Sequence, residues 1–125
     1  MGTWGSGNFD NDKALDYLAS VADPLVAQLQ AVVDTPSLAE ADEDGGIQCL
    51  VAAEILTGLS QYYTGPKLTP QLVTDCRDVV LAEWEATIDE LDPDEDYKTE
   101  RRAIMQQTFA QLLTVVQRWQ RHNSN

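Results

Sequence analysis

Four carboxylates are the residues of this chain whose types and positions could do chemistry: Asp10, Asp12, Asp16 and Glu54. Asp12 and Asp16 are four positions apart, so they share one face if this segment is helical. Glu54 stands in a second segment of helical character, and packing of the two segments would bring it to the aspartates. Such a cluster could bind a divalent cation or supply a general base. The four acids therefore admit a metal-assisted enzyme.

The same acids also have a structural interpretation, which we favour. Asp10 or Asn11 would cap the first helix, and Asp12 would add negative charge to its first turn. The remaining aspartate would face solvent. Glu54 would accept a hydrogen bond from the Trp4 indole or from a backbone amide of the glycine-rich segment beside it. This interpretation predicts no bound metal and no catalytic residue.

Other catalytic and cofactor chemistry finds no support in the residue types. Cys49 and Cys76 both fall on apolar helical segments, where we expect them to be reduced core residues. The one histidine, His122, lies in the polar C-terminal tail, so neither a zinc site nor a nucleophilic triad can be assembled. We expect no cofactor.

The chain opens with MGTWGSGNFDND, in which two aromatic residues stand among glycines. Gly5 and Gly7 permit backbone angles that other residues resist. This pattern predicts a chain segment laid over the core, with Trp4 and Phe9 inserted as two buried anchors. It is not a phosphate-binding loop, because the GK[ST] ending is missing and no strand precedes it.

Two segments, WGSGNFDNDKALDYL and LVAAEILTGL, the second followed by a GP turn, resemble the bacterial family called domain of unknown function 4259. The resemblance is strongest over residues 1–18. It implies a small helical bacterial protein without an assigned activity, and it transfers no catalytic residue. The matching positions are Trp4, Gly5, Phe9, Asn11, Asp12, Ala14, Asp16 and Glu54.

Helix-start signals and apolar periodicity predict an all-α chain that forms one domain over residues 1–125. An Asp-Pro or Thr-Pro pair at 23–24, 69–70 and 92–93 places an N-cap before a proline at the first helical position. We expect a compact bundle of about five helices with the aromatic and glycine-rich segment packed on its core. The expected helices cover 11–22, 24–34, 45–63, 70–91 and 93–121, with a break or kink at Pro24. Residues 35–44 are expected to form a loop, with room in it for one helical turn.

The third expected helix differs from the others, because Glu54 is its only charged side chain. Its large apolar residues fill a broad half-turn of the helix surface. A helix with so little charge is normally surrounded by its neighbours, so we expect it at the centre of the bundle. The apolar half-turn consists of Ile47, Val51, Ile55, Leu56, Leu59, Tyr62 and Tyr63.

The chain is strongly acidic, with a formal net charge of −13. Residues 98–125 hold five of the eight basic side chains but only one of the 21 acidic ones, so the acids belong to the rest of the chain. Such a body repels nucleic acid and anionic membranes and attracts basic partners. We therefore expect neither a nucleic-acid nor a membrane partner.

These observations favour a non-enzymatic, cytoplasmic protein that acts through contact with an unidentified, basic protein. Neutralisation of a basic toxin, as by immunity proteins, is one such function, suggested by charge and size alone. Two alternatives stay open. One is the metal-assisted enzyme built on the four acids, and the other is a structural homo-oligomer whose exposed aromatic surface is its own partner.

Overall fold

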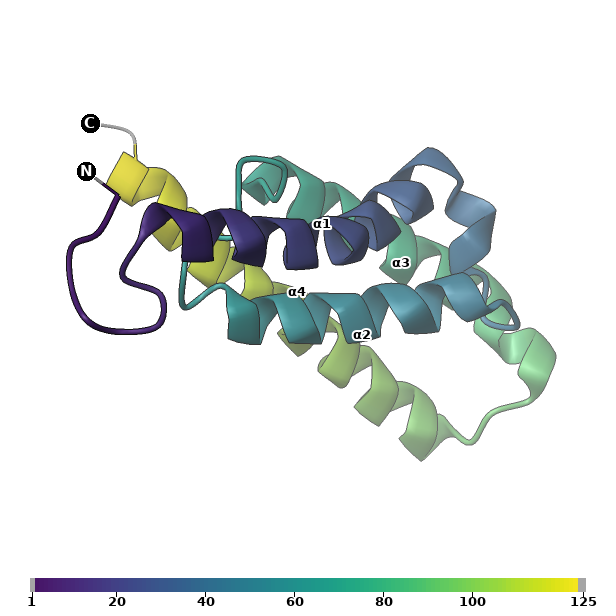
Figure 1. The fold of residues 1–125 in the computed structure, drawn as a ribbon. Coiled ribbons are helices and arrows are strands. Elements are labelled where there is room, and N and C mark those ends of the chain that lie inside the picture. The colour runs from purple at the N-terminus through teal and green to yellow at the C-terminus, as the bar shows by residue number, and fades with distance from the viewer. Residues whose placement is uncertain (1, 124–125) are drawn as a thin grey trace.

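The computed structural model describes residues 2–123, with side chains up to residue 120, and shows an all-α bundle (Figure 1). The predicted fold class is confirmed. Apart from one isolated bridge between Thr3 and Asn11, no strand pairing occurs in this part of the chain. Its elements are α1 (Asp12–Asp34), the 3-10 turn η1 (Pro36–Ala39), α2 (Asp44–Leu59), α3 (Pro70–Thr87), the 3-10 turn η2 (Ile88–Leu91) and α4 (Glu95–Asn123).

Two of the predicted helix starts are confirmed by their capping bonds. The Asn11 side chain accepts a hydrogen bond from the Ala14 amide at 2.8 Å, which begins α1. Thr69 does the same for the Leu72 amide at 3.1 Å, ahead of a proline in the first turn of α3. The start predicted at Asp92 is wrong: this residue ends η2 in the left-handed region, with φ 52°, and α4 begins at Glu95.

Of the break or kink predicted at Pro24, the break is wrong, because α1 runs unbroken through this proline. A proline inside a helix removes one backbone hydrogen bond and crowds the carbonyl four residues earlier. The buried stripe of α1 continues across it at helical spacing, so packing of both halves holds the helix together. That stripe consists of Leu18, Ala22, Val26, Leu29 and Val32.

The four helices surround one core, in which α1 and α4 each pack against both α2 and α3. The element η1 crosses one end of the bundle and contacts α1, α2 and α3. Gly45 permits this crossing, because a Cβ atom there would lie 2.5 Å from the Leu38 carbonyl oxygen. The largest fully buried side chains include Phe109, Leu112 and Met105 of α4 and Leu29 of α1.

Burial of α2 differs from the expectation that its broad apolar half-turn is enclosed. Its buried face is made mainly of small residues, and Ile47, Val51 and Ile55 are 56%, 53% and 45% exposed. Small side chains let neighbouring backbones approach closely, which favours burying that face over the one with the bulky residues. The buried residues are Gly46, Cys49, Leu50, Ala52, Ala53 and Leu56.

Replacing Pro24 with alanine should therefore stabilise the protein by about 1–3 kcal/mol, because it restores a backbone donor inside α1 and removes the ring's steric conflict. Urea unfolding of the two proteins measures this difference. The matched control is Pro70→Ala at the start of α3, where a proline is favoured and no gain is expected. Equal effects of the two substitutions would contradict the view that packing keeps α1 continuous through a proline that destabilises it.

Candidate functional site

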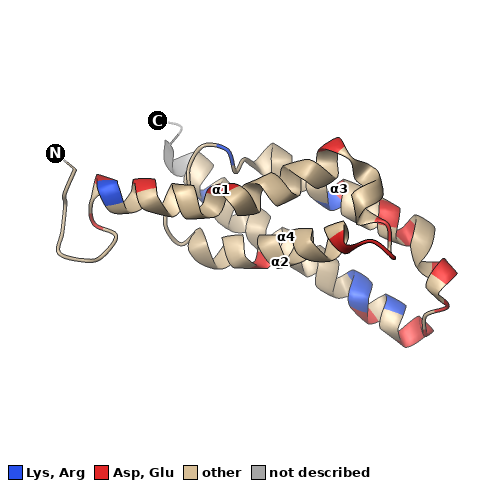
Figure 2. Cartoon of the chain, turned by 45° about the vertical axis from the view of Figure 1, so that its right-hand side comes forward, with Lys and Arg blue, Asp and Glu red and all other residues tan. Residues whose placement is uncertain are grey.

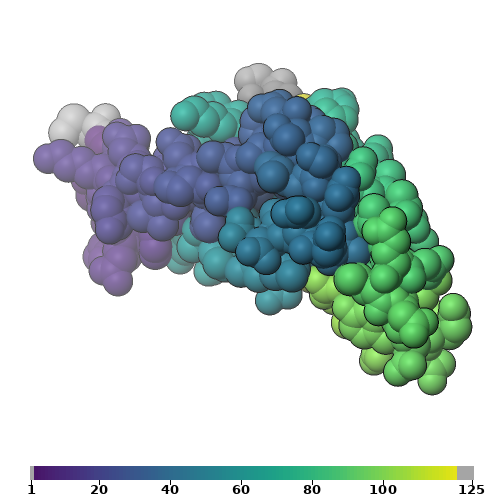
Figure 3. All heavy atoms as spheres, turned by 90° about the vertical axis from the view of Figure 1, so that its right-hand side faces the viewer, coloured from purple at the N-terminus to yellow at the C-terminus, as the bar shows by residue number. Residues whose placement is uncertain are grey.

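The end of the bundle that carries η1 and η2 contains a groove of about 840 Å³. In Figure 3 the green residues of η2 and the start of α4 project from the body beside the blue residues of η1 and the start of α2. The groove has walls from both parts. Its floor consists of Leu50, Val80, Trp84, Ile88 and Met105, all buried core residues.

Large apolar side chains on the walls of this groove are exposed to solvent. Ile47 comes from α2, Leu91 from η2, and Tyr97 and Ile104 from α4. Each of them is about half exposed, although the core lies directly beneath. A contiguous apolar surface of this kind, bordered by polar residues, is typical of a protein-binding or ligand-binding site.

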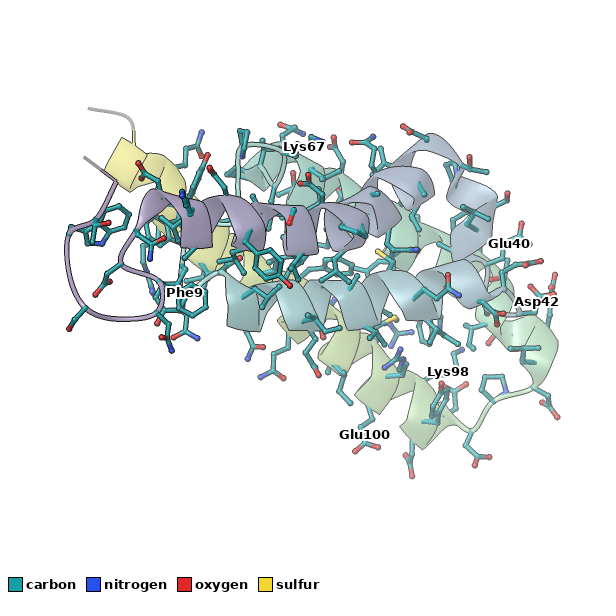
Figure 4. All side chains as sticks on the ribbon, viewed as in Figure 1. Phe9, Glu40, Asp42, Lys67, Lys98 and Glu100 are labelled. Carbon is teal, nitrogen blue, oxygen red and sulfur yellow. The ribbon has the colours of Figure 1, made fainter. Side chains whose placement is uncertain are left out.

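The border of the groove is acidic. Its carboxylates come from both walls: Glu40 and Glu43 precede α2, Asp92 and Asp94 follow η2, and Glu100 lies on α4. Among the residues whose side chains the structure describes, Arg101 is the only basic one that lines the groove. Figure 2 shows acidic residues gathered at this end of the bundle, and Figure 4 shows Glu40 and Glu100 on its two sides. The groove therefore combines an apolar floor with a negatively charged rim.

Ion pairs fix the projecting wall. The ammonium of Lys98 lies 2.7 Å from a carboxylate oxygen of Asp89 in η2 and 3.6 Å from one of Glu95, and its side chain is only 15% exposed. The hydrogen bond to Asp89 is the main cause that raises the pKa of Lys98. These contacts tie the first turn of α4 to η2, although each exposed pair adds little stability.

A second ion pair joins α4 to α3. Both nitrogens of one edge of the Arg102 guanidinium bind the carboxylate of Glu85, the Nη2–Oε2 distance being 3.1 Å. The guanidinium also lies over the ring of Trp84, 5.5 Å from its centroid. Its hydrogen bond to the carboxylate lowers the pKa of Glu85. Arg102 thus packs on a residue of the groove floor while it holds α4 against α3.

The sign of this pKa shift predicts how the pair depends on pH. The pKa of Glu85 is lower in the folded than in the unfolded protein. The ion pair therefore adds its full stability at any pH above the pKa that Glu85 has in the unfolded protein. This stability is lost as pH falls through the pKa that Glu85 has in the folded protein. Glu85→Gln should cost at most about 1 kcal/mol at neutral pH, since the pair is partly exposed. The cost should vanish in acid. Denaturant unfolding of both proteins at the two pH values checks this, and an equal cost at both would contradict it.

The N-terminal segment forms a closed loop around the carboxylate of Asp10. This carboxylate accepts a hydrogen bond from the Gly7 amide at 2.9 Å, and the Trp4 amide donates to the Asp10 carbonyl at 3.0 Å. A Cβ atom at Gly5 or Gly7 would lie 2.5 Å or 2.7 Å from the same carboxylate oxygen. A side chain at either position would therefore displace the Asp10 carboxylate from the inside of the loop.

Only one of the two expected anchors in this segment is covered. Phe9 stacks on Tyr62 with ring centroids 4.1 Å apart and an angle of 15° between the planes (Figure 4 shows Phe9 between the loop and the bundle). Trp4 is 57% exposed, so the expectation that it is buried is wrong. The loop is closed by its own hydrogen bonds, and it touches the bundle through Phe9 rather than through Trp4.

Phe9→Ala should accordingly lower the free energy of unfolding by about 1–3 kcal/mol, because it removes a half-buried ring and its stacking contact with Tyr62. Trp4→Ala should change it by less than about 0.5 kcal/mol, as substitutions of exposed residues do. Thermal and urea unfolding of the two variants provide the comparison. A larger loss for Trp4→Ala than for Phe9→Ala would show that the tryptophan is the anchor after all.

The four carboxylates considered for metal binding have separate structural settings. Asp10 lies inside the N-terminal loop, Asp12 is exposed in the first turn of α1, and Asp16 and Glu54 are exposed on α1 and α2. Within residues 2–123, no group of three or more histidine, cysteine, aspartate or glutamate side chains could hold a metal ion. The N-cap role falls to Asn11.

Asp10, rather than the predicted Glu54, accepts a hydrogen bond from an amide of the loop. It binds the Gly7 amide from within the loop itself. His122 lies beyond the last residue whose side chain the structure describes. Cys49 and Cys76 are fully buried free cysteines, as expected for core residues.

Sequence reasoning missed the groove because it assigned Ile47, which stands on the groove wall, to the core together with the other exposed residues Val51 and Ile55. A signal was present: the residues at 45, 46, 49, 52 and 53 are all glycine, cysteine or alanine and recur at helical spacing. Two apolar faces on one helix, one small and one bulky, indicate that only one of them is needed for packing.

Comparison with known proteins supports a family but no activity. The family described as "Domain of unknown function (DUF4259)" matches residues 2–124, nearly the whole chain. No curated protein and no solved structure gives a significant match. None of the helices described over residues 2–123 has the length and apolar character needed to cross a membrane.

Proposed function

The chain belongs to the DUF4259 family, and from its own groove we propose that it is a non-enzymatic protein that binds a basic, amphipathic helix of a partner protein. The observation that carries this proposal is the pairing of exposed apolar walls with an acidic rim. Grooves between helices commonly accept a helix that inserts apolar side chains at positions three or four apart. The remaining polar face of such a helix then meets the rim.

The dimensions and the floor of the groove suit large apolar anchors. A volume of about 840 Å³ lies over Trp84, Leu50 and Met105, and Ile47 and Ile104 stand on its two walls. Removing such apolar surface from water supplies affinity at about 25 cal/mol per Å² before the costs of association. Leucine or aromatic residues of a partner would contact the same side chains that are left uncovered here.

The charge of the chain supports a basic partner. The rim carboxylates lie within a molecule of net charge −13, so their field adds to that of the whole body. Complementary charge accelerates encounter and rejects acidic competitors more than it increases affinity. Lysine or arginine residues on the outer face of the bound helix would meet Glu40, Glu43 and Glu100.

Neutralisation of a basic toxin, as immunity proteins achieve, is one form that this function takes. We place the interaction in the cytoplasm, where free thiols such as those of Cys49 and Cys76 are kept reduced. The metal-assisted enzyme receives no support from the carboxylates among the described residues. A second copy of the chain is the competing occupant of the apolar surface. The mass of the protein in solution distinguishes it from a partner helix.

The test uses a labelled synthetic peptide of about 18 residues, which is about 27 Å long as a helix, with leucine on one face and lysine on the other. We expect fluorescence anisotropy to show binding that weakens as salt rises, because the Debye length falls to about 8 Å at physiological ionic strength. Ile47→Glu should raise the dissociation constant at least about tenfold, since a charge then occupies the apolar wall.

Val21→Glu is the matched control, because Val21 is an exposed valine on α1 that does not line the groove. It adds the same negative charge, so attraction by net charge alone would make both variants bind the lysine peptide at least as tightly as the wild type. Equal binding by the two variants would therefore contradict the groove. A mass in solution of two chains, abolished by Ile47→Glu, would assign the surface to a second copy instead.

A further inference from the structure

Two buried thiols meet across the middle of the bundle. The sulfur atoms of Cys49 in α2 and Cys76 in α3 lie 3.0 Å apart, and neither residue is accessible to solvent. They are free cysteines, 27 positions apart in the sequence. Neither thiol lines the groove or contacts the N-terminal loop.

We propose that Cys49 and Cys76 are a redox pair that closes to a reversible disulfide when the protein meets a peroxide. A disulfide has a sulfur–sulfur distance of about 2.05 Å, so closure requires the two atoms to approach by about 1 Å. Each thiol has the other as its nearest reaction partner. The pair thus has what a lone buried cysteine lacks, a second thiol to complete the reaction.

The reaction balances with hydrogen peroxide as the two-electron oxidant. One sulfur attacks a peroxide oxygen, the O–O bond breaks, and a sulfenic acid and one water form. The second thiol gives up its proton and attacks the sulfenic sulfur, the S–O bond breaks, and a second water leaves. Two thiols and one peroxide become one disulfide and two waters. A dithiol reductant reverses the result by thiol–disulfide exchange.

The surroundings of the pair determine its rate and its product. The contact with the Cys49 sulfur and burial both raise the pKa of Cys76, so this thiol stays protonated in the folded protein and reacts slowly. Oxidation accordingly depends on brief opening of the core. Once a sulfenic acid has formed and the core has closed, the facing thiol traps it before a second peroxide can enter.

A bridge at this position would join two walls of the bundle. Cys49 directly precedes Leu50, and Cys76 lies one turn before Val80, and both of these neighbours are floor residues of the groove. The bond would also close a loop between the two cysteines in the unfolded chain and so lower the conformational entropy of the unfolded state. Oxidised protein should therefore be more stable to heat, while its helix content stays the same.

The test compares wild type with Cys49→Ala and Cys76→Ala, each held folded with hydrogen peroxide and then unfolded for thiol counting and peptide mass mapping. We expect wild type to lose both thiols and to yield one linked peptide pair containing residues 49 and 76. Its melting temperature should rise by about 10 °C, and dithiothreitol should reverse the rise. Neither variant should gain stability or form an intramolecular link.

Three results would overturn the proposal. One is sulfinic or sulfonic acid at both positions of the wild type in place of a link. Another is full retention of both thiols under a peroxide treatment that oxidises them in urea. The last is a link that lowers the melting temperature. Because none of these measurements uses a partner or peptide, they do not depend on the function proposed for the groove.

Discussion

The choice of which face of α2 is buried governs the rest of the structure. This helix has two apolar faces, and the one that enters the core is built mainly from glycine, cysteine and alanine. Small side chains allow close approach of backbones, as the Gly45 contact with the Leu38 carbonyl shows. Packing density in a core depends on such fits, whereas exposed apolar side chains are tolerated singly. The bulky row at Ile47, Val51 and Ile55 is consequently left on the surface.

The long helix α4 converts that choice into a groove, because its two ends are held by different kinds of interaction. Near its C-terminal end, Trp119 donates a hydrogen bond to the Ser60 carbonyl at 2.6 Å, and its ring meets Tyr63 edge to face. At its start, ion pairs of Lys98 and Arg102 join it to η2 and α3. Partly exposed ion pairs contact the start of the helix without burying apolar surface, and Tyr97 and Ile104 remain uncovered.

The sequence predicts those features that depend on neighbours along the chain. All-helical structure, the caps at Asn11 and Thr69, and burial of both cysteines follow from local patterns and are present. The course of α1 through Pro24 does not, because the compensating packing comes from other helices. Exposure of Trp4 likewise depends on a loop whose glycines serve Asp10 rather than the core.

The candidate site is harder to predict from the sequence than the fold is. Its apolar walls come from α2, η2 and α4, and its rim comes from segments on either side of these elements. No local pattern states that such segments meet. The aspartates near the N-terminus are recognisable as a candidate cluster because they are close together in the sequence. The acids that surround an apolar surface, however, are those of the groove rim. Of the features of the site, the sequence shows only that α2 has apolar residues on more than one face. That pattern alone predicts a helix buried on all sides, which is not what the structure has.

Charge and apolar exposure have to be considered together to decide what covers the groove. Exposed apolar walls favour association with any complementary surface, including a second copy of the chain. A second copy, however, would bring its own net charge of −13 and would place like carboxylates against the rim. Like charges brought together at an interface oppose association, whereas a basic helix would neutralise the rim as it covers the walls. The rim carboxylates would therefore oppose pairing of two copies across the groove and favour a basic occupant, in line with the function we propose.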